Sequence, residues 1–184
     1  MNYIGNASSY LTNLIFGIAL YLMLLRYWMQ WVHADFRNPI GRFIISLTNP
    51  VVIPMRRILP SFRSVDTATL LLAYALAVLS ILILVSLSGQ NYSWISLLSF
   101  SLGKVIDASI NIFMLAILVQ ILASWLNPHA YHPALDIARA IAEPLLAPAR
   151  RLIPAIGGLD ISPILVFVFL NLSKILVVAP LQNV

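Results

Sequence analysis

The sequence predicts an all-α membrane protein: four transmembrane helices from a tandem parallel repeat, with short proline-broken amphipathic helices in each cytoplasmic loop. Three observations lead to this prediction. Of the 184 residues, 61% are hydrophobic and 9% are charged, which lies outside the range of soluble globular proteins. Four apolar windows approach the ~20 residues needed to cross a hydrocarbon layer of about 30 Å. The second half of the chain also repeats the pattern of the first.

The apolar windows define the expected spans in order along the chain. They cover residues 11–31, 68–88, 105–126 and 163–179, of which the last is the shortest. No basic residue precedes the first apolar run, so this segment is not typical of a cleavable signal peptide, and we expect the first helix to be retained. Residues 92–102 join the second and third spans, either as an interfacial segment or as an early start of the third helix.

A shift of 94 positions aligns the two halves without a gap. The aligned identities include Trp31 with Trp125, Pro39 with Pro133, Pro50 with Pro144, Pro54 with Pro148, Arg56 with Arg150, Arg57 with Arg151 and Asp66 with Asp160. We therefore expect two repeats, residues 1–90 and 91–184, each with two transmembrane helices and an amphipathic loop. Because each repeat has an even number of spans, both copies enter the membrane in the same orientation.

Arginines occupy the loop within each repeat, whereas the opposite side of the membrane carries only Lys104. The loop arginines are Arg37, Arg42, Arg56, Arg57 and Arg63 in the first repeat and Arg139, Arg150 and Arg151 in the second. By the positive-inside rule, both loops face the cytoplasm and both termini face outward. This arrangement accounts for the formal net charge of +5, so no nucleic-acid partner is expected.

Proline is expected to break the helix in each cytoplasmic loop. Each helix begins with a proline, Pro39 or Pro133, at the first helical position, where the missing N–H costs nothing. Further prolines should then stop the helix, because proline lacks a backbone donor and forces the residue before it out of the helical region. These are Pro50 and Pro54 in the first repeat and Pro144 and Pro148 in the second, followed by Pro60 and Pro154. We expect two short helical pieces separated by bends.

An arginine pair follows the second interrupting proline of each repeat, in the stretches "NPVVIPMRRILP" and "EPLLAPARRLIP". The pairs are Arg56 with Arg57 and Arg150 with Arg151. A short helix with an apolar face and basic heads suits the headgroup layer, where arginine binds phosphate and its aliphatic stem stays in the apolar zone. We interpret residues 50–57 and 144–151 as a basic collar that engages anionic phospholipid or a protein partner. The alternative is that these arginines only determine topology.

Four polar residues in the third and fourth spans predict an intramembrane polar cluster. They are Asp107, Asn111, Asn171 and Lys174. With both termini outside, Asp107 and Lys174 lie at similar depth, each with an asparagine one turn deeper. A charge at that depth needs a partner, so we expect an ion pair supported by the two asparagines. The alternative is that Lys174 snorkels to the outer headgroups while Asp107 is interfacial.

The first repeat does not reproduce this cluster, because Asn13, Gly17, Ala77 and Ser80 stand at its equivalent positions. Arg26 aligns with Gln120 near the cytoplasmic ends of the first and third spans, and we expect Arg26 to snorkel toward the membrane boundary. Ala73, Ala77 and Ser80 form a small-residue stripe on the second span, which is typical of close helix packing.

The sequence offers no catalytic constellation. The absence of cysteine excludes disulfides, thiolate metal sites and cysteine nucleophiles. No nucleophile is paired with a base by any motif, and no glycine-rich phosphate loop is present. His129 and His132 lie three positions apart, but a loop-surface interpretation is favoured over a metal site. We therefore expect no enzymatic activity, no cofactor and no metal.

The P-x3-P-x-R-R-x2-P pattern, the duplication and the "DISPI" of residues 160–164 resemble the YggT family of bacterial inner-membrane proteins, which is related to YlmG and to plastid relatives. The resemblance covers nearly the whole chain, and it implies a protein of the inner (plasma) membrane. In that membrane, the orientation expected from the positive-inside rule puts both termini on the periplasmic side. It also implies a role in osmotic or potassium homeostasis, in membrane organisation near the division machinery or, in plastids, in cytochrome assembly. In the first repeat, "DTATL" of residues 66–70 replaces "DISPI".

Two functions follow from these observations. The first is a non-enzymatic inner-membrane organiser, or an assembly or stress-response factor, whose basic collar engages anionic phospholipid or a protein partner. The second is a channel or transporter component in potassium or osmotic homeostasis, with a polar path through the second repeat. Four helices that fill their own bundle leave little room for a pore, so conduction would require a homo-oligomer or a larger partner. We therefore rank the organiser first.

Overall fold

The computed structural model describes residues 3–59, 66–89, 92–126, 132–153 and 160–183. Two bent amphipathic helices and four long apolar helices make up this part of the chain. Their bounds are α1 Tyr3–Trp31, α2 Pro39–Ile58, α3 Thr67–Ser88, α4 Trp94–Leu126, α5 Pro133–Leu152, α6 Ser162–Ser173, the π-helical turn η1 Lys174–Val178, and α7 Ala179–Gln182. Pro60, Arg63, His129 and Pro154, which the sequence analysis singled out, lie outside the described residues.

Four helices are long and apolar enough to cross a membrane, as the hydropathy pattern predicts. They are α1, α3, α4 and the continuous run Ser162–Gln182 formed by α6, η1 and α7. The segment that joins the repeats belongs to α4, which begins at Trp94, so the early start of the third helix is the correct alternative. Ser93 begins this helix, since its Oγ accepts a hydrogen bond from the Ser96 N–H over 3.0 Å.

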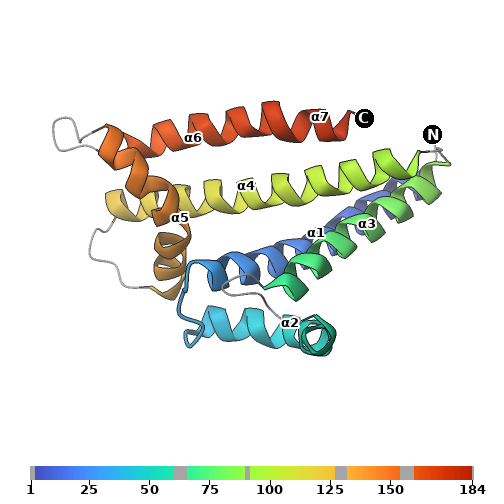
Figure 1. The fold of residues 1–184 in the computed structure, drawn as a ribbon, viewed down its shortest axis with the longest axis horizontal. Coiled ribbons are helices and arrows are strands. Elements are labelled where there is room, and N and C mark those ends of the chain that lie inside the picture. Colours follow the sequence, from blue (N-terminus) through green and yellow to red (C-terminus); the bar gives the residue numbers. More distant parts are fainter. Residues whose placement is uncertain (1–2, 60–65, 90–91, 127–131, 154–159, 184) are drawn as a thin grey trace.

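The spanning helices lie side by side, with both chain ends at one end of the bundle (Figure 1). Within the first repeat α1 packs against α3, within the second α4 packs against α6, η1 and α7, and α4 also contacts α1 and α3. Helix α2 packs on α1 and α3, as α5 packs on α4 and α6, at the end opposite the chain termini. We call this the arginine end. The two repeats therefore place equivalent helices in equivalent contacts.

Helices α2 and α5 continue through their internal prolines, so the prediction that Pro50 and Pro144 stop each helix is wrong. Each proline removes one backbone donor and bends the helix without ending it. In Figure 1, the first part of α2 runs across the view and its last part is seen end on. Apolar packing on both sides of the bend holds each helix together, since Ile44 and Val52 are buried in α2, as are Ile141 and Leu146 in α5.

The four prolines inside these helices are all on exposed positions. Each helix therefore buries the face that carries no proline. The carbonyls that lose a donor to proline lie toward the exposed face, where water or lipid headgroups can satisfy them. Helix α2 begins where Asn38 Oδ1 accepts from the Gly41 N–H, and α5 begins where His132 Nδ1 accepts from the Ala134 N–H. Each of the two bent helices thus starts with a side-chain cap and a proline.

The small-residue stripe on α3 faces the interior, because Ala73, Ala77 and Ser80 are all buried. Small side chains allow helices to approach closely, which fits the packing of α3 against both α1 and α4. The stripe therefore has a structural explanation.

Candidate functional site

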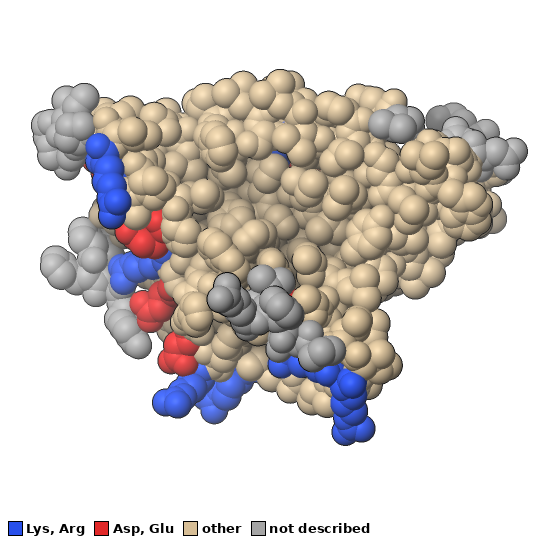
Figure 2. Space-filling view, in the orientation of Figure 1, with Lys and Arg blue, Asp and Glu red and all other residues tan. Residues whose placement is uncertain are grey.

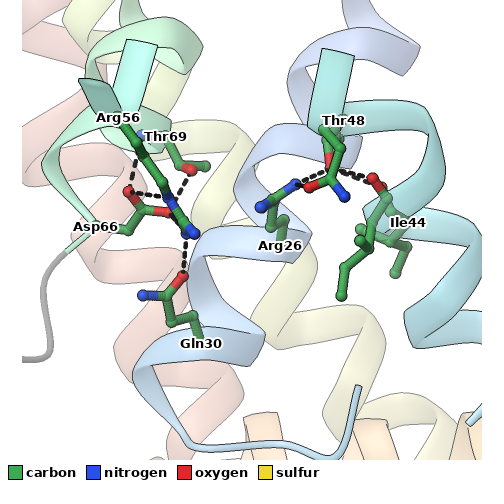
Figure 3. A network of polar contacts seen from close by, with 9 residues as sticks. Arg26, Gln30, Ile44, Thr48, Arg56, Asp66 and Thr69 are labelled. Carbon is green, nitrogen blue, oxygen red and sulfur yellow. Dashed lines mark hydrogen bonds and ion pairs between the residues drawn. The ribbon is translucent and has the colours of Figure 1, made fainter. Parts of the chain in front are cut away.

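Three helices of the first repeat are joined by the Arg56 guanidinium, which lies in the last turn of α2 (Figure 3). Its Nη2 donates to Asp66 Oδ2, and over 2.9 Å to Gln30 Oε1 on α1. Its Nε donates to Asp66 Oδ1 over 3.4 Å. The Asp66 carboxylate also caps α3, because it accepts from the Thr69 hydroxyl over 2.5 Å and from the Thr69 N–H over 3.3 Å.

The Asp66 side chain has no exposed surface, while the Arg56 side chain is 37% exposed. Burial alone would raise the pKa of Asp66, but the hydrogen bonds from Arg56 and Thr69 outweigh it and hold that pKa below its ordinary value. The carboxylate is therefore charged at neutral pH, and both of its oxygens accept hydrogen bonds from within the protein. We call Arg56, Asp66, Gln30 and Thr69 the closed clip.

Arg26 does not snorkel, contrary to the prediction from its position near the end of α1. It is only 5% exposed, and its Nη1 donates to Thr48 Oγ1 over 2.5 Å and to Asn49 Oδ1 over 2.9 Å (Figure 3). The Thr48 hydroxyl donates in turn to the Ile44 carbonyl over 2.6 Å. At the membrane boundary, water or headgroups would accept hydrogen bonds from this guanidinium, and here α2 supplies the acceptors instead. Hydrogen bonds from a charged donor are stronger than those from a neutral donor. Arg26 therefore fastens α2 to α1.

The second repeat makes the equivalent ion pair in a more open form. Arg150 Nε donates to Asp160 Oδ2 over 3.0 Å, and Nη1 donates to both carboxylate oxygens of Glu143 over 3.0 Å. The Asp160 side chain is 42% exposed, whereas its counterpart Asp66 is fully buried. Partial burial raises the pKa of Asp160, but hydrogen bonds from Ser162 and Arg150 hold it below its ordinary value. We call Arg150, Asp160 and Glu143 the open clip.

The second arginine of each pair has no partner in the part of the chain that the structure describes. Arg57 and Arg151 are exposed and make no hydrogen bond or ion pair with the described residues. Each is followed by a strongly exposed apolar residue, Ile58 at 75% and Leu152 at 74%. Figure 2 shows the charged side chains gathered over the end and flank formed by α5 and α2, while the surface along the spanning helices is almost free of charge. The collar therefore divides into internal and outward-facing arginines.

The structure brings three of the four predicted intramembrane polar residues together. Lys174 Nζ lies 2.9 Å from Asp107 Oδ1 and donates to Asn111 Oδ1 over 2.7 Å. Asn111 Nδ2 donates to Asp107 Oδ2 over 2.9 Å and to the Tyr21 hydroxyl over 3.2 Å. Tyr21, from α1, is a member that the spacing did not predict, because the spacing does not show that α1 contacts α4. The π-helical turn η1 begins at Lys174 itself.

Asn171 is not brought into this cluster, because its Nδ2 donates to the Phe167 carbonyl of its own helix over 2.8 Å. A second lysine contact, which the residue spacing did not predict, joins the two repeats: Lys104 Nζ on α4 donates to the buried Ser80 Oγ on α3 over 2.7 Å. Ser80 is the first-repeat equivalent of Lys174, so an ammonium group lies at this position in each repeat, supplied by the second repeat in both cases. In the part of the chain that the structure describes, no group of three or more metal-ligating side chains is found.

These features define a class: a multi-pass helical membrane protein in which two copies of a two-span unit each carry a bent helix clipped to the bundle by an arginine and an aspartate. The chain belongs to the CCB3/YggT family, whose model matches it twice, at residues 5–87 and 99–181. Both the starts and the ends of these two matches are 94 positions apart, the offset of the internal repeat.

Several bacterial proteins are similar over almost their full length. An uncharacterized protein of Pseudomonas aeruginosa is 35% identical over 95% of this chain and 90% of its own. A Vibrio alginolyticus protein is 36% identical over 93% of both chains, and the protein named YggT in Escherichia coli K12 is 33% identical over 96% of this chain and 92% of its own. No solved structure is significantly similar to this chain.

Proposed function

We propose that this protein is a non-enzymatic organiser or assembly factor of a bacterial inner membrane, and that its collar engages anionic phospholipid. The observation that carries the proposal is that the two arginines of each pair make different contacts. Arg56 and Arg150 are held by carboxylates of their own repeat, whereas Arg57 and Arg151 have no such partner among the described residues. An ion pair that fastens the bent helix does not require a second, outward-facing arginine beside it in both repeats.

The surroundings of the free arginines fit the headgroup layer of a membrane. A guanidinium can hold phosphate oxygens bidentately, while its aliphatic stem lies along apolar surface. Ile58 and Leu152, exposed beside the free arginines, would enter the acyl boundary in the manner of an interfacial helix. Each basic residue near an anionic surface contributes about 1 kcal/mol of attraction. The two repeats together thus offer two similar contact points at the arginine end.

The orientation is part of the proposal. The loop arginines favour a cytoplasmic location of the arginine end, by the positive-inside rule. Both chain termini lie at the opposite end of the bundle, so a cytoplasmic arginine end would put them on the periplasmic side. The collar would then meet the anionic lipid of the inner leaflet.

The test measures phospholipid retained by the purified full chain after reconstitution with phosphatidylglycerol and phosphatidylcholine. Arg57→Gln with Arg151→Gln should lower phosphatidylglycerol enrichment about fivefold per arginine, which corresponds to about 1 kcal/mol each. Arg37→Gln with Arg42→Gln removes the same charge from exposed positions just before α2 and in its first turn, and should leave most of the enrichment. Unchanged enrichment in the first variant would refute the proposal. Loss of a co-purifying protein instead would assign the collar to a protein partner.

The alternative is a channel or transporter component, and the cluster around Lys174 favours it. An ion pair within apolar spans is costly and is frequently functional, and π-helical turns are often found at functional sites. Potassium flux into proteoliposomes made with the pure protein would support this role if Lys174→Ala abolished the flux. Absence of flux in the unmodified protein would leave the organiser as the better account.

A further inference from the structure

A hollow of about 550 Å³ lies at the arginine end of the second repeat, bounded by α4, α5 and the start of α6. Its described lining includes Gln120, Ser124, Trp125, Leu146, Arg150 and Asp160. It therefore lies next to the open clip. The hollow combines charged groups with apolar walls, unlike the apolar grooves elsewhere on the bundle.

The first repeat shows why the hollow exists. The positions equivalent to Gln120, Ser124 and Pro163 are Arg26, Gln30 and Thr69. All three are larger or more polar, and all three are used: Arg26 binds α2, Gln30 accepts from Arg56, and Thr69 donates to Asp66. In the second repeat, the side chains at these positions are smaller or less polar and do not fill the equivalent space. The first repeat fills the site with its own side chains, and the second leaves it open.

The open site has polar groups that lack a partner among the described residues. Gln120 Oε1 is buried and accepts no hydrogen bond from any of them. A buried acceptor without a donor costs about 1–3 kcal/mol, so a ligand with an N–H group would relieve this cost. Arg150 uses Nε for Asp160 and Nη1 for Glu143, and its Nη2 makes no hydrogen bond with the described residues. The described lining of the site therefore offers one buried acceptor, one guanidinium donor and the Asp160 carboxylate.

The charge balance selects among membrane ligands. Arg150 stands against Glu143 and Asp160, so the open clip has an excess of one negative charge. A purely anionic headgroup would be repelled by this excess, whereas a headgroup with both an ammonium and a phosphate adds no net charge and can pair its ammonium with a carboxylate and its phosphate with Arg150. Trp125 and Ile164, both strongly exposed beside the hollow, provide apolar surface for acyl chains. The end of a spanning helix is also the depth at which headgroups lie.

We propose that this hollow is a binding site for an ethanolamine phospholipid. The primary ammonium donates to Gln120 Oε1 and to the Asp160 carboxylate, and a phosphate oxygen accepts from Arg150 Nη2. A choline headgroup has the same charge but no N–H donor, so it cannot satisfy Gln120. This site goes beyond the collar function and does not depend on Arg57 or Arg151.

The test uses the full chain in nanodiscs of equimolar phosphatidylethanolamine, phosphatidylcholine and phosphatidylglycerol, with native mass spectrometry of the retained lipid. The unmodified protein should retain one phosphatidylethanolamine, enriched about tenfold over phosphatidylcholine, which corresponds to about 1.4 kcal/mol. Ser124→Gln, alone or with Gln120→Arg, installs the side chains of the first repeat and should abolish the enrichment. Gln120→Leu keeps the volume but removes the acceptor, and should reduce the enrichment about threefold or more.

Ser86→Gln is the matched control, because Ser86 is also an exposed serine that donates to a carbonyl of its own spanning helix, in the other repeat. It should keep the full enrichment. Arg57→Gln with Arg151→Gln should also keep it, which separates this site from the outward-facing arginines of the collar. Equal retention of ethanolamine and choline lipids by the unmodified protein, or full enrichment in Ser124→Gln, would overturn the proposal. Displacement by water-soluble glycerophosphoethanolamine at equal concentration would show that the ligand is not a lipid.

Discussion

The two clips should differ in strength, because the same ion pair is buried in one repeat and open in the other. Asp66→Asn removes the charge from a carboxylate with no exposed surface and leaves Arg56 facing a neutral amide. Asparagine can still cap α3 through Thr69, so the loss is that of the charged contact alone. Hydrogen bonds to charged groups contribute about 1.5–3 kcal/mol each. Since Arg56 is partly exposed and can be rehydrated, we expect a total loss of about 2–3 kcal/mol.

Asp160→Asn provides the matched comparison. Both partners of the open clip are partly exposed, and Arg150 keeps Glu143 as a second carboxylate. Exposed ion pairs contribute about 0–1 kcal/mol, so we expect a loss below about 1 kcal/mol. Thermal and denaturant unfolding in the same bicelles, followed by circular dichroism, would give both values. Equal losses, or a larger loss for Asp160→Asn, would refute the conclusion that the first clip is the structural one.

Three further predictions test other contacts. The pKa of Asp66 is lowered by folding, so its contribution to stability is present above the unfolded value of about 3.9 and is lost as pH falls through the folded pKa; acid titration should destabilise the unmodified protein more than Asp66→Asn. Arg26→Gln should lower the free energy of unfolding by about 1.5–3 kcal/mol, because Gln cannot make both charged contacts to α2, and an unchanged value would contradict the anchoring role. Lys174→Asp should be destabilising and should be rescued by Asp107→Lys in the same unfolding assay; a double variant no better than either single one would exclude a direct pair.

The spans and the repeat could be predicted because they depend on patterns that extend over many residues. The continuity of the bent helices through their prolines could not be predicted, because tertiary packing outweighs the local tendency of proline to end a helix. Pro50 removes one donor, but Ile44 and Val52 bury the helix on either side of it. The sequence does contain a pattern that indicates the clips, because an arginine and an aspartate ten positions apart occur in both repeats. They are Arg56 with Asp66 and Arg150 with Asp160.

The polar cluster shows the limit of spacing arguments. Asn111 and Asn171 are each placed one turn from a charged residue, yet only Asn111 contacts its neighbours across helices. Which asparagine faces the partner depends on how each helix is rotated in the bundle, and both sides of these helices are apolar. Tyr21 joins from α1 for the same reason. A sequence that is hydrophobic all round gives little indication of which face is inside.

The two repeats have diverged in complementary ways. The first has filled its arginine end with Arg26, Gln30 and the closed clip, and the second has kept a hollow beside the open clip. The second also carries the Lys174 ion pair, whereas Ser80, the first-repeat equivalent of Lys174, accepts a hydrogen bond from Lys104 of the second repeat. The first copy thus fastens its bent helix to the bundle with more side chains, and the second copy keeps the space in which we propose that a ligand binds.

The most direct test of the account measures which side of the membrane reaches the free arginines. The sequence has no cysteine, so Arg57→Cys and Arg151→Cys each introduce a single reactive thiol. If the arginine end is cytoplasmic, a membrane-impermeant maleimide labels both in inverted inner-membrane vesicles and neither in cells whose inner membrane is intact. Labelling of either position from the outer side of the intact membrane would contradict it.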